Sequence, residues 1–347
     1  MRVALYSIKP YEKPFLEAAN ANSRHELGFL QTRLTAETAE LARGTQAVSI
    51  FVGDDASAPV LRALHAGCQG GKLALLLRSA GFNHVDVAEA ESLGITVLRV
   101  PAYSPYSVAE HAVGLMLTLN RKFHRAFNRV REQNFALGGL MGFDMHGKTV
   151  GVIGTGTIGA VVCNILSGFG CVVIASDPSP SPACTAMGVQ YVPLAELYER
   201  SDIITLHCPL TPATRHLIGA AALAAMKPGA MLINTSRGAV IDTRALIAAL
   251  KSGQIGSVGL DVYEEEGDLF FKDLSTEVIQ DDVFARLMTF PSVLITAHQG
   301  FFTREACTAI AQTTINNATD FEHGQVNDAN RVGIRHIAPT TVNPAGH

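Results

Sequence analysis

The stretch TVGVIGTGTIG, residues Thr149–Gly159, decides the fold of this chain. Its β-branched apolar run, Val150–Ile153, predicts a buried strand, and the apolar residues that follow Gly159 predict a helix. The glycine spacing between them is typical of the turn that carries the pyrophosphate of a dinucleotide. Gly154 would permit the tight turn, Gly156 would let the backbone approach the pyrophosphate, and Gly159 would let the helix pack on the strand.

An acidic residue at the end of the next apolar run supports the same interpretation. The run CVVIAS ends in Asp177, where a carboxylate can accept hydrogen bonds from both ribose hydroxyls. The alternative is an ordinary strand-to-helix turn, because three glycines also recur by chance. Strand, glycine turn, helix, strand and acid together favour a dinucleotide. Since Asp177 would repel a 2′-phosphate and Pro178-Ser179 brings no arginine, we expect NADH rather than NADPH.

The composition describes a globular protein and excludes several classes of partner. A length of 347 residues corresponds to about two domains, and 48% apolar with 17% charged residues allows an ample core. A net charge of −4 without a basic run argues against nucleic acid or an anionic membrane as a partner. We expect no secretory signal and no membrane helix, which would need roughly 18 apolar residues. Six scattered cysteines predict reduced thiols, no metal site and a cytoplasmic protein.

Strand and helix patterns alternate along the chain, which predicts parallel sheets flanked by helices. In the first hundred residues we expect strands at 3–8, 47–52, 73–77 and 95–100 and helices at 35–43, 59–66 and 87–93. After the glycine unit we expect strands at 203–208, 230–235, 258–262 and 293–297 and helices at 194–200, 221–226, 243–251 and 303–321. We interpret 264–290 as irregular and 336–347 as an ordered arm at best.

A long apolar helix is expected at Val108–Lys122, where we place the crossing between the two domains. Ser107 with Glu110 has the spacing of a capping box, so we expect Ser107 to cap this helix. The apolar character of the helix suits burial between two domains or in a two-fold dimer, the commonest assembly. The basic residues at 121–131 are interpreted as a solvated helix face.

Three reactive side chains follow the ends of strands expected in the second half: Arg237, Glu266 and His298. Ligands of open parallel sheets bind at the carboxyl ends of the strands, so we expect all three on the edge of the glycine turn. Arg237 could hold a carboxylate by two hydrogen bonds, His298 could donate a proton near neutral pH, and Glu266 could orient the imidazole. The alternatives are a surface arginine and a core histidine. Three complementary groups favour hydride transfer to a 2-keto acid.

Seven pieces of the sequence resemble, in order, the D-isomer-specific 2-hydroxyacid dehydrogenase family: RSAGFNHVD (78–86), VPAYSPYSVAEHAVG (100–114), GVIGTGTIG (151–159), HCPLTPATRHLI (207–218), LINTSRGAVID (232–242), GLDVYEEE (259–266) and TAHQGFFT (296–303). The resemblance implies an α/β fold of two doubly wound parallel-sheet domains. A Rossmann NAD-binding domain would span 102–299, and a smaller flavodoxin-like substrate domain would combine 1–101 with 300–347. The cofactor would be NAD.

The resemblance also implies roles for single residues. Arg237 would anchor the substrate carboxylate, Glu266 would be the partner of the histidine, and His298 would be the acid–base. Asp261 would contact the nicotinamide amide. The implied cofactor contacts are Gly154, Gly156, Thr157, Ile158, Gly159, Asp177, Cys208, Pro209, Thr214, Thr235, Ser236, Arg237 and Asp261. The implied substrate contacts are Ser79, Ala80, Gly81, Tyr103, Arg237 and His298.

Within the family, three stretches resemble the fermentative D-lactate branch: YSIKPYEKPF near the start, EEEGDLFFKDLSTEVIQDD, and Gln299–Phe302. That branch implies reversible hydride transfer between NADH and pyruvate, giving D-lactate. We expect a homodimer or a dimer of dimers. The alternatives are a larger 2-keto acid, such as phenylpyruvate or hydroxypyruvate, and an NADH-sensing binding protein. A carboxylate at Glu266, in place of the glutamine of formate dehydrogenases, argues against formate, whose oxidation transfers no proton.

Overall fold

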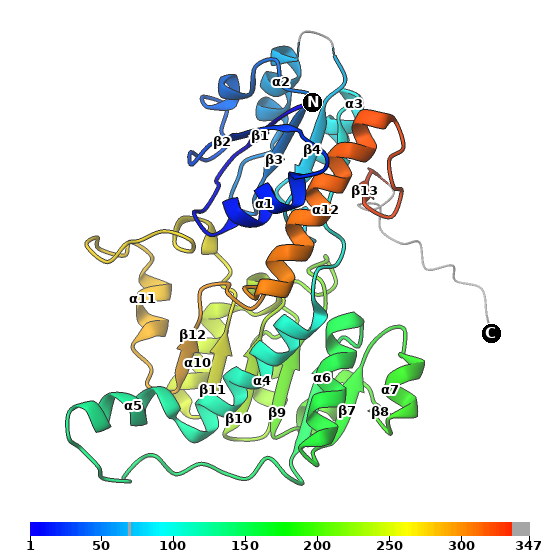
Figure 1. The fold of residues 1–347 in the computed structure, drawn as a ribbon. Helices are drawn as coiled ribbons and strands as arrows, with labels where there is room; N and C mark the ends of the chain where they lie inside the picture. Colours follow the sequence, from blue (N-terminus) through cyan, green and yellow to red (C-terminus); the bar gives the residue numbers. More distant parts are fainter. Residues whose placement is uncertain (69–70, 335–347) are drawn as a thin grey trace. The chain divides into compact units, whose positions relative to one another are not determined.

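The computed structural model describes residues 1–68 and 71–334, so the arm expected at 336–347 lies outside the described residues. The chain divides into two compact units, which we call unit 1 and unit 2 (Figure 1). Unit 1 contains Met1–Ser104 and the chain from Thr303 onward, and unit 2 contains Pro105–Phe302. The chain therefore leaves unit 1, completes unit 2, and returns to unit 1 with its last helix, α12 (Arg304–His323).

The sheet of unit 1 has the strand order β13-β5-β4-β3-β1-β2, and its neighbours are parallel except for β13 against β5. The strands are β1 (Arg2–Leu5), β2 (Glu26–Phe29), β3 (Ala47–Ile50), β4 (Ala74–Leu77), β5 (Thr96–Leu98) and β13 (Arg331–Val332). The helices besides α12 are α1 (Glu12–Asn20), α2 (Ala58–Gly67), α3 (Val87–Ser92) and the 3-10 helix η1 (Ala39–Ala42).

Helices cover both faces of this sheet, as the continuous apolar strands require. Alternate residues of β4 show the two layers: Leu75 and Leu77 pack with side chains of α2, α3 and η1, whereas Ala74 and Leu76 pack with α1 and α12. In Figure 1, α1 and α12 lie on the same side of the strands. The expectation of a doubly wound parallel sheet is confirmed for this unit.

The sheet of unit 2 is entirely parallel, with the order β12-β11-β10-β9-β6-β7-β8. The strands are β6 (Thr149–Ile153), β7 (Val172–Ser176), β8 (Gln190–Tyr191), β9 (Ile203–Leu206), β10 (Ala230–Asn234), β11 (Ile255–Leu260) and β12 (Val293–Ile295). From β6 the chain builds first toward β8 and then, starting again at β9, toward β12. The order thus switches beside β6, and such a switch point is where open α/β sheets bind ligands.

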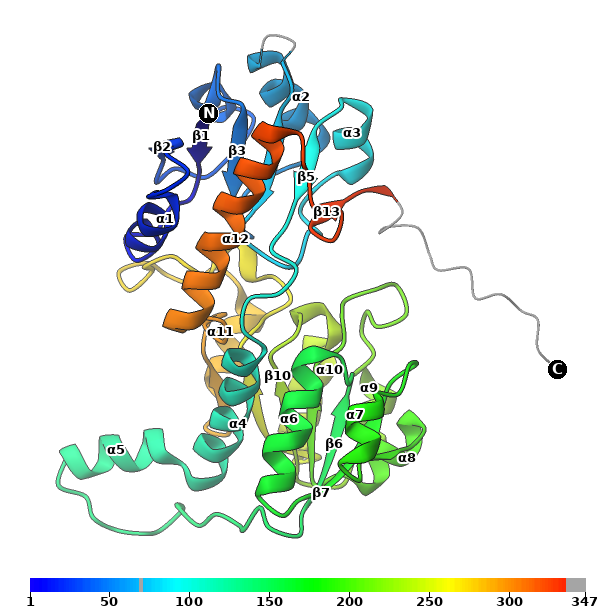
Figure 2. The same cartoon turned by 45° about the vertical axis from the view of Figure 1, so that its right-hand side comes forward.

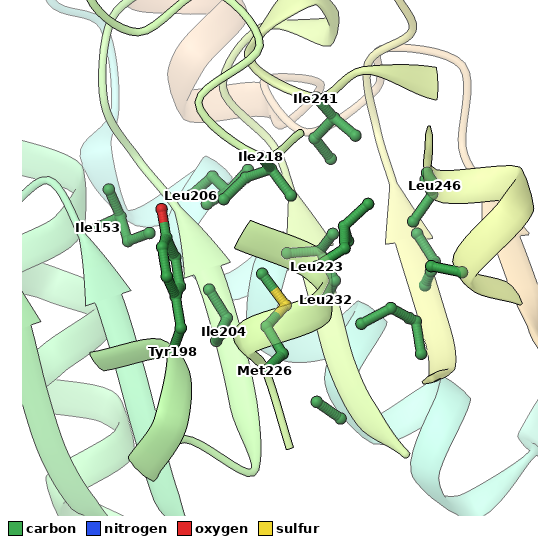
Figure 3. Close-up of a cluster of buried hydrophobic side chains, with 14 of the residues drawn as sticks. Ile153, Tyr198, Ile204, Leu206, Ile218, Leu223, Met226, Leu232, Ile241 and Leu246 are labelled. Carbon is green, nitrogen blue, oxygen red and sulfur yellow. The ribbon is translucent and has the colours of Figure 1, made fainter. Parts of the chain in front are cut away.

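Two helical layers enclose the sheet of unit 2. One layer contains α4 (Pro105–Arg121), α6 (Thr157–Gly168) and α7 (Pro182–Ala186), and α4 and α6 lie side by side (Figures 1 and 2). The other contains α8 (Leu194–Arg200), α9 (Ala220–Ala225), α10 (Thr243–Ser252) and α11 (Asp282–Met288). Figure 3 shows the core between this second layer and the sheet, where Tyr198, Leu223 and Leu246 of the helices pack against Ile204 and Leu232 of the strands. The expected Rossmann fold is confirmed.

The helix α4 starts earlier and packs differently than the sequence suggested. It begins at Pro105, because proline suits the first turn of a helix, where its missing N–H is not needed. Ser107 is therefore a buried residue inside the helix, and the expected cap at this position is wrong. The apolar face of α4 is buried within unit 2, where Leu115 and Leu119 pack against Gly259 of β11.

Several short elements lie outside the expectations. The helix expected at 35–43 is reduced to η1, and α1 and β2 occupy a stretch for which no element was expected. The region 264–290 contains the 3-10 helix η3 (Glu266–Asp268) and α11, which is capped by the carboxylate of Asp281. Among the described residues, no helix has both the length and the apolar character to cross a membrane.

Candidate active site

The turn between β6 and α6 contains three glycines, and only Gly156 has free space beside its Cα. Gly154 has φ +92°, and a Cβ there would lie 2.8 Å from the backbone of His207 and Cys208. A Cβ on Gly159 would lie 2.0 Å from the carbonyl oxygen of Gly154, whereas one on Gly156 would meet nothing within 4 Å. Gly154 and Gly159 are thus required by packing, while Gly156 leaves space at the start of α6. The N–H groups of Thr157 and its successors begin that helix and suit a phosphate.

The carboxylate of Asp177 lies beside this turn at the end of β7. It accepts hydrogen bonds from the backbone N–H groups of Ser179, at 2.7 Å, and Thr155, at 2.6 Å. The hydroxyl of Tyr191 also holds this turn in place, because it donates to Thr155 Oγ1 and accepts from Ser181 N, both at 2.8 Å. Asp177 is therefore fixed where the sequence expects the adenosine ribose.

The loop after β9 borders the same turn. Cys208 is buried under Gly154, and burial raises the pKa of its thiol to about 11. Thr214 Oγ1 donates to Pro209 O at 2.6 Å and accepts from Thr211 N at 2.8 Å. The expected cofactor contacts Cys208, Pro209 and Thr214 thus belong to one compact loop next to the glycine turn.

Glu266 and His298 are brought together at the carboxyl ends of β11 and β12, which are neighbours in the sheet. The distance from His298 Nδ1 to Glu266 Oε1 is 2.9 Å, and the other carboxylate oxygen accepts from Tyr263 N at 3.2 Å. Because an ionised carboxylate only accepts hydrogen bonds, it makes Nδ1 the donor. Nε2 is then the ring nitrogen that can exchange a proton with a substrate.

The loop that carries His298 is strained and is held by Asp261. Ala297 and His298 have φ values of +50° and +59°, a region that residues other than glycine rarely adopt. The carboxylate of Asp261 accepts from the backbone N–H groups of Gln299 and Gly300, both at 2.8 Å, and its carbonyl oxygen accepts from His298 N at 2.5 Å. These bonds fix the loop in the strained conformation.

Asp261 is 2% exposed, and two side chains complete its surroundings. Thr296 Oγ1 donates to it at 2.6 Å, and His111 Nε2 of α4 lies 3.3 Å from the same oxygen. Burial alone would raise the pKa of Asp261, but the hydrogen bonds from His111 and Thr296 outweigh it and hold the pKa below its usual value. His111 was not singled out from the sequence, although it lies in the quoted piece VAEHAVG; no local pattern links it to a strand end far along the chain.

Arg237 follows β10, the next strand in the sheet. Its Nη1 donates to Ser236 O at 2.7 Å, and Asn234 Nδ2 donates to Arg237 O at 2.9 Å. A Cβ on Gly238 would lie 2.0 Å from the carbonyl carbon of Tyr263. The backbone next to Arg237 is thus in contact with the loop that leads to Glu266, and the ends of β10, β11 and β12 carry all three expected catalytic side chains.

The residues present fit a dinucleotide. The open space at Gly156 leaves room at the helix start for a pyrophosphate. Thr235, which follows β10, is 8% exposed, and its hydroxyl has no hydrogen-bond partner within the described part of the chain. A buried hydroxyl of this kind suits a ligand that completes the site. In residues 1–68 and 71–334, no group of three or more His, Cys, Asp and Glu side chains could hold a metal ion.

The remaining expected contacts, Ser79–Gly81 and Tyr103, lie in unit 1. Ser79 Oγ donates to Gly81 O at 2.7 Å, and Arg99 Nη1 donates to Ala80 O at 3.1 Å. Val100 N donates to Ser79 O at 3.1 Å. The carbonyl groups of this loop are thus all used within the unit, which fixes its backbone. Tyr103 lies in the segment after β5 that leads to α4.

Comparison with known proteins agrees with this site. The family model of the D-isomer specific 2-hydroxyacid dehydrogenase NAD-binding domain matches residues 113–300. The chain is 53% identical to D-lactate dehydrogenase of Escherichia coli (strain K12) over 325 residues, which are 94% of this chain and 98% of that protein.

Two solved structures extend the similarity to the fold. The apo-structure of the Escherichia coli D-lactate dehydrogenase has a TM-score of 0.87 at 50% identity, covering 96% of this chain and 100% of that one. The pyruvate reductase of Chlamydomonas reinhardtii has a TM-score of 0.88 at 46% identity, covering 94% and 97%. With a glycine turn that fits NAD and this similarity over both units, the chain belongs to the D-isomer specific 2-hydroxyacid dehydrogenase family and is an NAD-dependent oxidoreductase.

Proposed function

We propose that this enzyme reduces pyruvate to D-lactate with NADH, in a reversible reaction. The observation that carries the proposal is the 2.9 Å contact between Glu266 and His298 at the edge of the sheet that also bears the glycine turn. The names of the relatives support the substrate, since two of them are a D-lactate dehydrogenase and a pyruvate reductase. In the direction of reduction, NADH supplies the hydride, one proton is consumed, and D-lactate and NAD⁺ are released.

We assign the proton to His298. Its Nε2 donates the proton to the carbonyl oxygen as the hydride arrives at the carbon, and in the reverse direction it accepts that proton. Glu266 holds the ring through Nδ1, which leaves Nε2 as the nitrogen that exchanges the proton. Arg237 binds the substrate carboxylate by two hydrogen bonds, for which its guanidinium turns from Ser236 O toward the substrate.

We assign unit 1 to substrate binding and unit 2 to NAD binding. In unit 1, the N–H groups of the loop Ser79–Gly81 are proposed donors to the substrate carboxylate. Two of them, on Ala80 and Gly81, make no hydrogen bond within the described part of the chain. Tyr103 is the proposed apolar contact to the substrate methyl group. In unit 2, Asp177 binds the adenosine ribose and repels the 2′-phosphate of NADPH.

The test is an NADH absorbance assay over a panel of 2-keto acids, with a chiral readout of the product. Pyruvate is expected to have the highest kcat/KM, with D-lactate as the product; a higher value for phenylpyruvate or hydroxypyruvate would replace the proposed substrate. His298→Gln is expected to lower kcat by at least about 100-fold while NADH binding is retained. The matched control is His323→Gln, at the exposed end of α12. Unchanged turnover in His298→Gln would remove this residue from the mechanism.

We also propose that the enzyme is a homodimer, formed by the segment 123–143. The helix α5 (Phe123–Arg131) has no buried residue, and Phe127, Leu137 and Met141 are 62%, 82% and 89% exposed. An apolar surface of this kind marks an interaction site, and a second copy in two-fold symmetry would cover it. The dimer expected at Val108–Lys122 is not supported, because the apolar side chains of α4 are buried in unit 2.

The dimer can be tested by light scattering coupled to size-exclusion chromatography. Phe127→Asp is expected to give monomers, whereas Val278→Asp, an 81% exposed apolar residue outside the segment, leaves the dimer intact. A monomeric wild-type protein would contradict the proposal. For the compartment, we propose the cytoplasm: all six cysteines are free thiols, as is usual in reducing surroundings.

A further inference from the structure

A contact between a histidine and a carboxylate, outside the proposed catalytic residues, joins two loops of the active-site edge. His216 Nε2 lies 2.6 Å from Glu264 Oε1. Two other groups face the same carboxylate: Arg215 Nη2, at 3.7 Å from Oε1, and Thr243 Oγ1, which donates to Oε2 at 3.3 Å. The Glu264 side chain is only 17% exposed, so its charge needs these partners.

The pair encloses the turn that follows Arg237. On one side, His216 N donates to Ala239 O at 2.8 Å, and Ile218 N donates to Val240 O at 3.0 Å. On the other side, Gly238 packs against the peptide between Tyr263 and Glu264, because a Cβ there would lie 2.3 Å from Glu264 N. The turn is therefore held between the segment of His216 and the segment of Glu264, and the contact between these two side chains closes the arrangement.

Glu264 is also connected to the partner of the catalytic histidine. It lies two positions before Glu266, and Glu266 Oε2 accepts a hydrogen bond from Tyr263 N at 3.2 Å, which closes the turn that contains Glu264. His216 itself has φ +51°, a conformation that costs energy for a side-chain-bearing residue and persists where surrounding contacts impose it. The strained residue and the partly buried carboxylate thus meet at the point where the loops of Arg237 and Glu266 touch.

We propose that His216 and Glu264 form a positioning pair for substrate binding, which sets the place of the Arg237 turn relative to Glu266. The inference rests on the proposed function, in which Arg237 binds the substrate carboxylate. Neither His216 nor Glu264 has a part in the chemical step. Displacing a substrate-binding group by about 1 Å is enough to cost a large factor in catalysis, so loss of the pair acts through the geometry of Arg237.

The experiment compares His216→Leu, Glu264→Ala and the double variant, with pyruvate and NADH as the varied substrates. Each single variant is expected to raise the KM for pyruvate by about tenfold, with kcat reduced less than threefold and the Kd for NADH unchanged. The double variant is expected to match the single ones, because both remove the same contact. His216→Gln, whose amide can still donate to Glu264, is expected to recover most of the affinity for pyruvate.

The matched control is Glu196→Ala, which breaks the Glu196–Arg200 ion pair on α8 in the same unit, and is expected to leave KM and kcat as in the wild type. An unchanged KM for pyruvate in the single variants would overturn the inference. Multiplying losses in the double variant, or equal effects on pyruvate and NADH with a lowered melting temperature, would overturn it as well. If Glu264→Ala does not fold, the comparison of His216→Leu with His216→Gln provides the test, because only the first of these removes the contact with Glu264.

The inference and the proposed function fail in different ways. A wild-type enzyme that reduces no 2-keto acid would refute the proposed function. A wild-type enzyme that reduces pyruvate, with variants that bind it equally well, would refute only the positioning pair. If another 2-keto acid is the better substrate, the same series applies to that acid, because Arg237 is assigned to the carboxylate that all of them share.

Discussion

Alanine substitutions at two glycines of the turn between β6 and α6 are expected to affect different properties of the enzyme. At Gly159 the new Cβ would lie 2.0 Å from Gly154 O, a backbone atom that cannot rotate away. At Gly156 the new Cβ would meet nothing within 4 Å, and the residue has an ordinary extended conformation. Gly159→Ala should therefore mainly destabilise unit 2, whereas Gly156→Ala should mainly weaken the binding of NADH.

The structure sets the size of both effects. Relief of the contact at Gly159 needs a shift of α6 from β6 by about 1 Å, and overpacking of this kind costs about 1–3 kcal/mol. For a unit of this size that corresponds to a fall in melting temperature of about 2–12 °C. In Gly156→Ala, alanine is the poorer N-cap and costs about 1 kcal/mol at most. Its methyl group occupies the space left for the pyrophosphate, so the Kd for NADH should rise at least about tenfold.

Thermal unfolding and the fluorescence of NADH measure the two quantities separately. The chain contains no tryptophan, so the nicotinamide signal is followed without that background. The reasoning is refuted if Gly156→Ala binds NADH as tightly as the wild type, because the open space would then not be the pyrophosphate site. It is also refuted if Gly159→Ala melts at the wild-type temperature.

Three further predictions concern single charged groups. Asp177→Ala should narrow the preference for NADH over NADPH by about tenfold or more in kcat/KM, because the like charge that repels the 2′-phosphate is lost; an unchanged preference would contradict this role. Asp261→Asn should lower kcat more than NADH affinity, since an amide has one acceptor oxygen for the two N–H groups of Gln299 and Gly300; a larger effect on NADH affinity would favour the nicotinamide contact instead. Burial lowers the pKa of His207 to about 4, below about 6.5 for an unfolded histidine. Above pH 6.5 the ring is neutral in both states and the folded protein keeps its full stability. As the pH falls from 6.5 toward 4, the unfolded chain binds a proton that the folded protein does not, so the free energy of unfolding falls. Between pH 7 and 5, the urea-derived unfolding free energy of the wild type should fall about 1–2 kcal/mol more than that of His207→Asn, and equal slopes would contradict the assignment.

The glycine unit could be predicted because its information is local. The strand, turn, helix and acid of 149–177 follow one another directly, and each is marked by β-branched residues, by glycine or by charge. The ends of β10 and β12 were equally readable, and the sheet order then places Arg237 and His298 on neighbouring strands of one edge. Sequence reasoning from strand ends needs only the parallel arrangement, not the side-chain contacts.

Other elements could not be predicted because their patterns are weak or their partners are distant. The helix α1 has Pro14 in its first turn and a single buried residue, Leu16, so it reads as a loop. The start of α4 was misplaced because Ser107 with Glu110 matches the spacing of a capping box, whereas the helix begins at Pro105, in line with the preference of proline for the first helical position. The return of α12 to unit 1 could be predicted only from the family resemblance, since the pattern of an amphipathic helix does not indicate which of two sheets it packs against.

The loops at the carboxyl ends of β10, β11 and β12 are held largely by one another. Asp261 binds the loop of His298, Glu266 pairs with His298 itself, and Gly238 packs against residues 263–264. These contacts join polar side chains and backbone above the core, so a change in one loop alters the position of the next. Substitutions in two of these loops should therefore lower kcat/KM by factors that do not multiply. A cavity in the core, such as the one left by Leu232→Ala, should instead lower the stability of unit 2 and leave the KM of the folded enzyme unchanged. The sheet thus sets which side chains reach the edge, and the contacts among the loops set the distances at which they act.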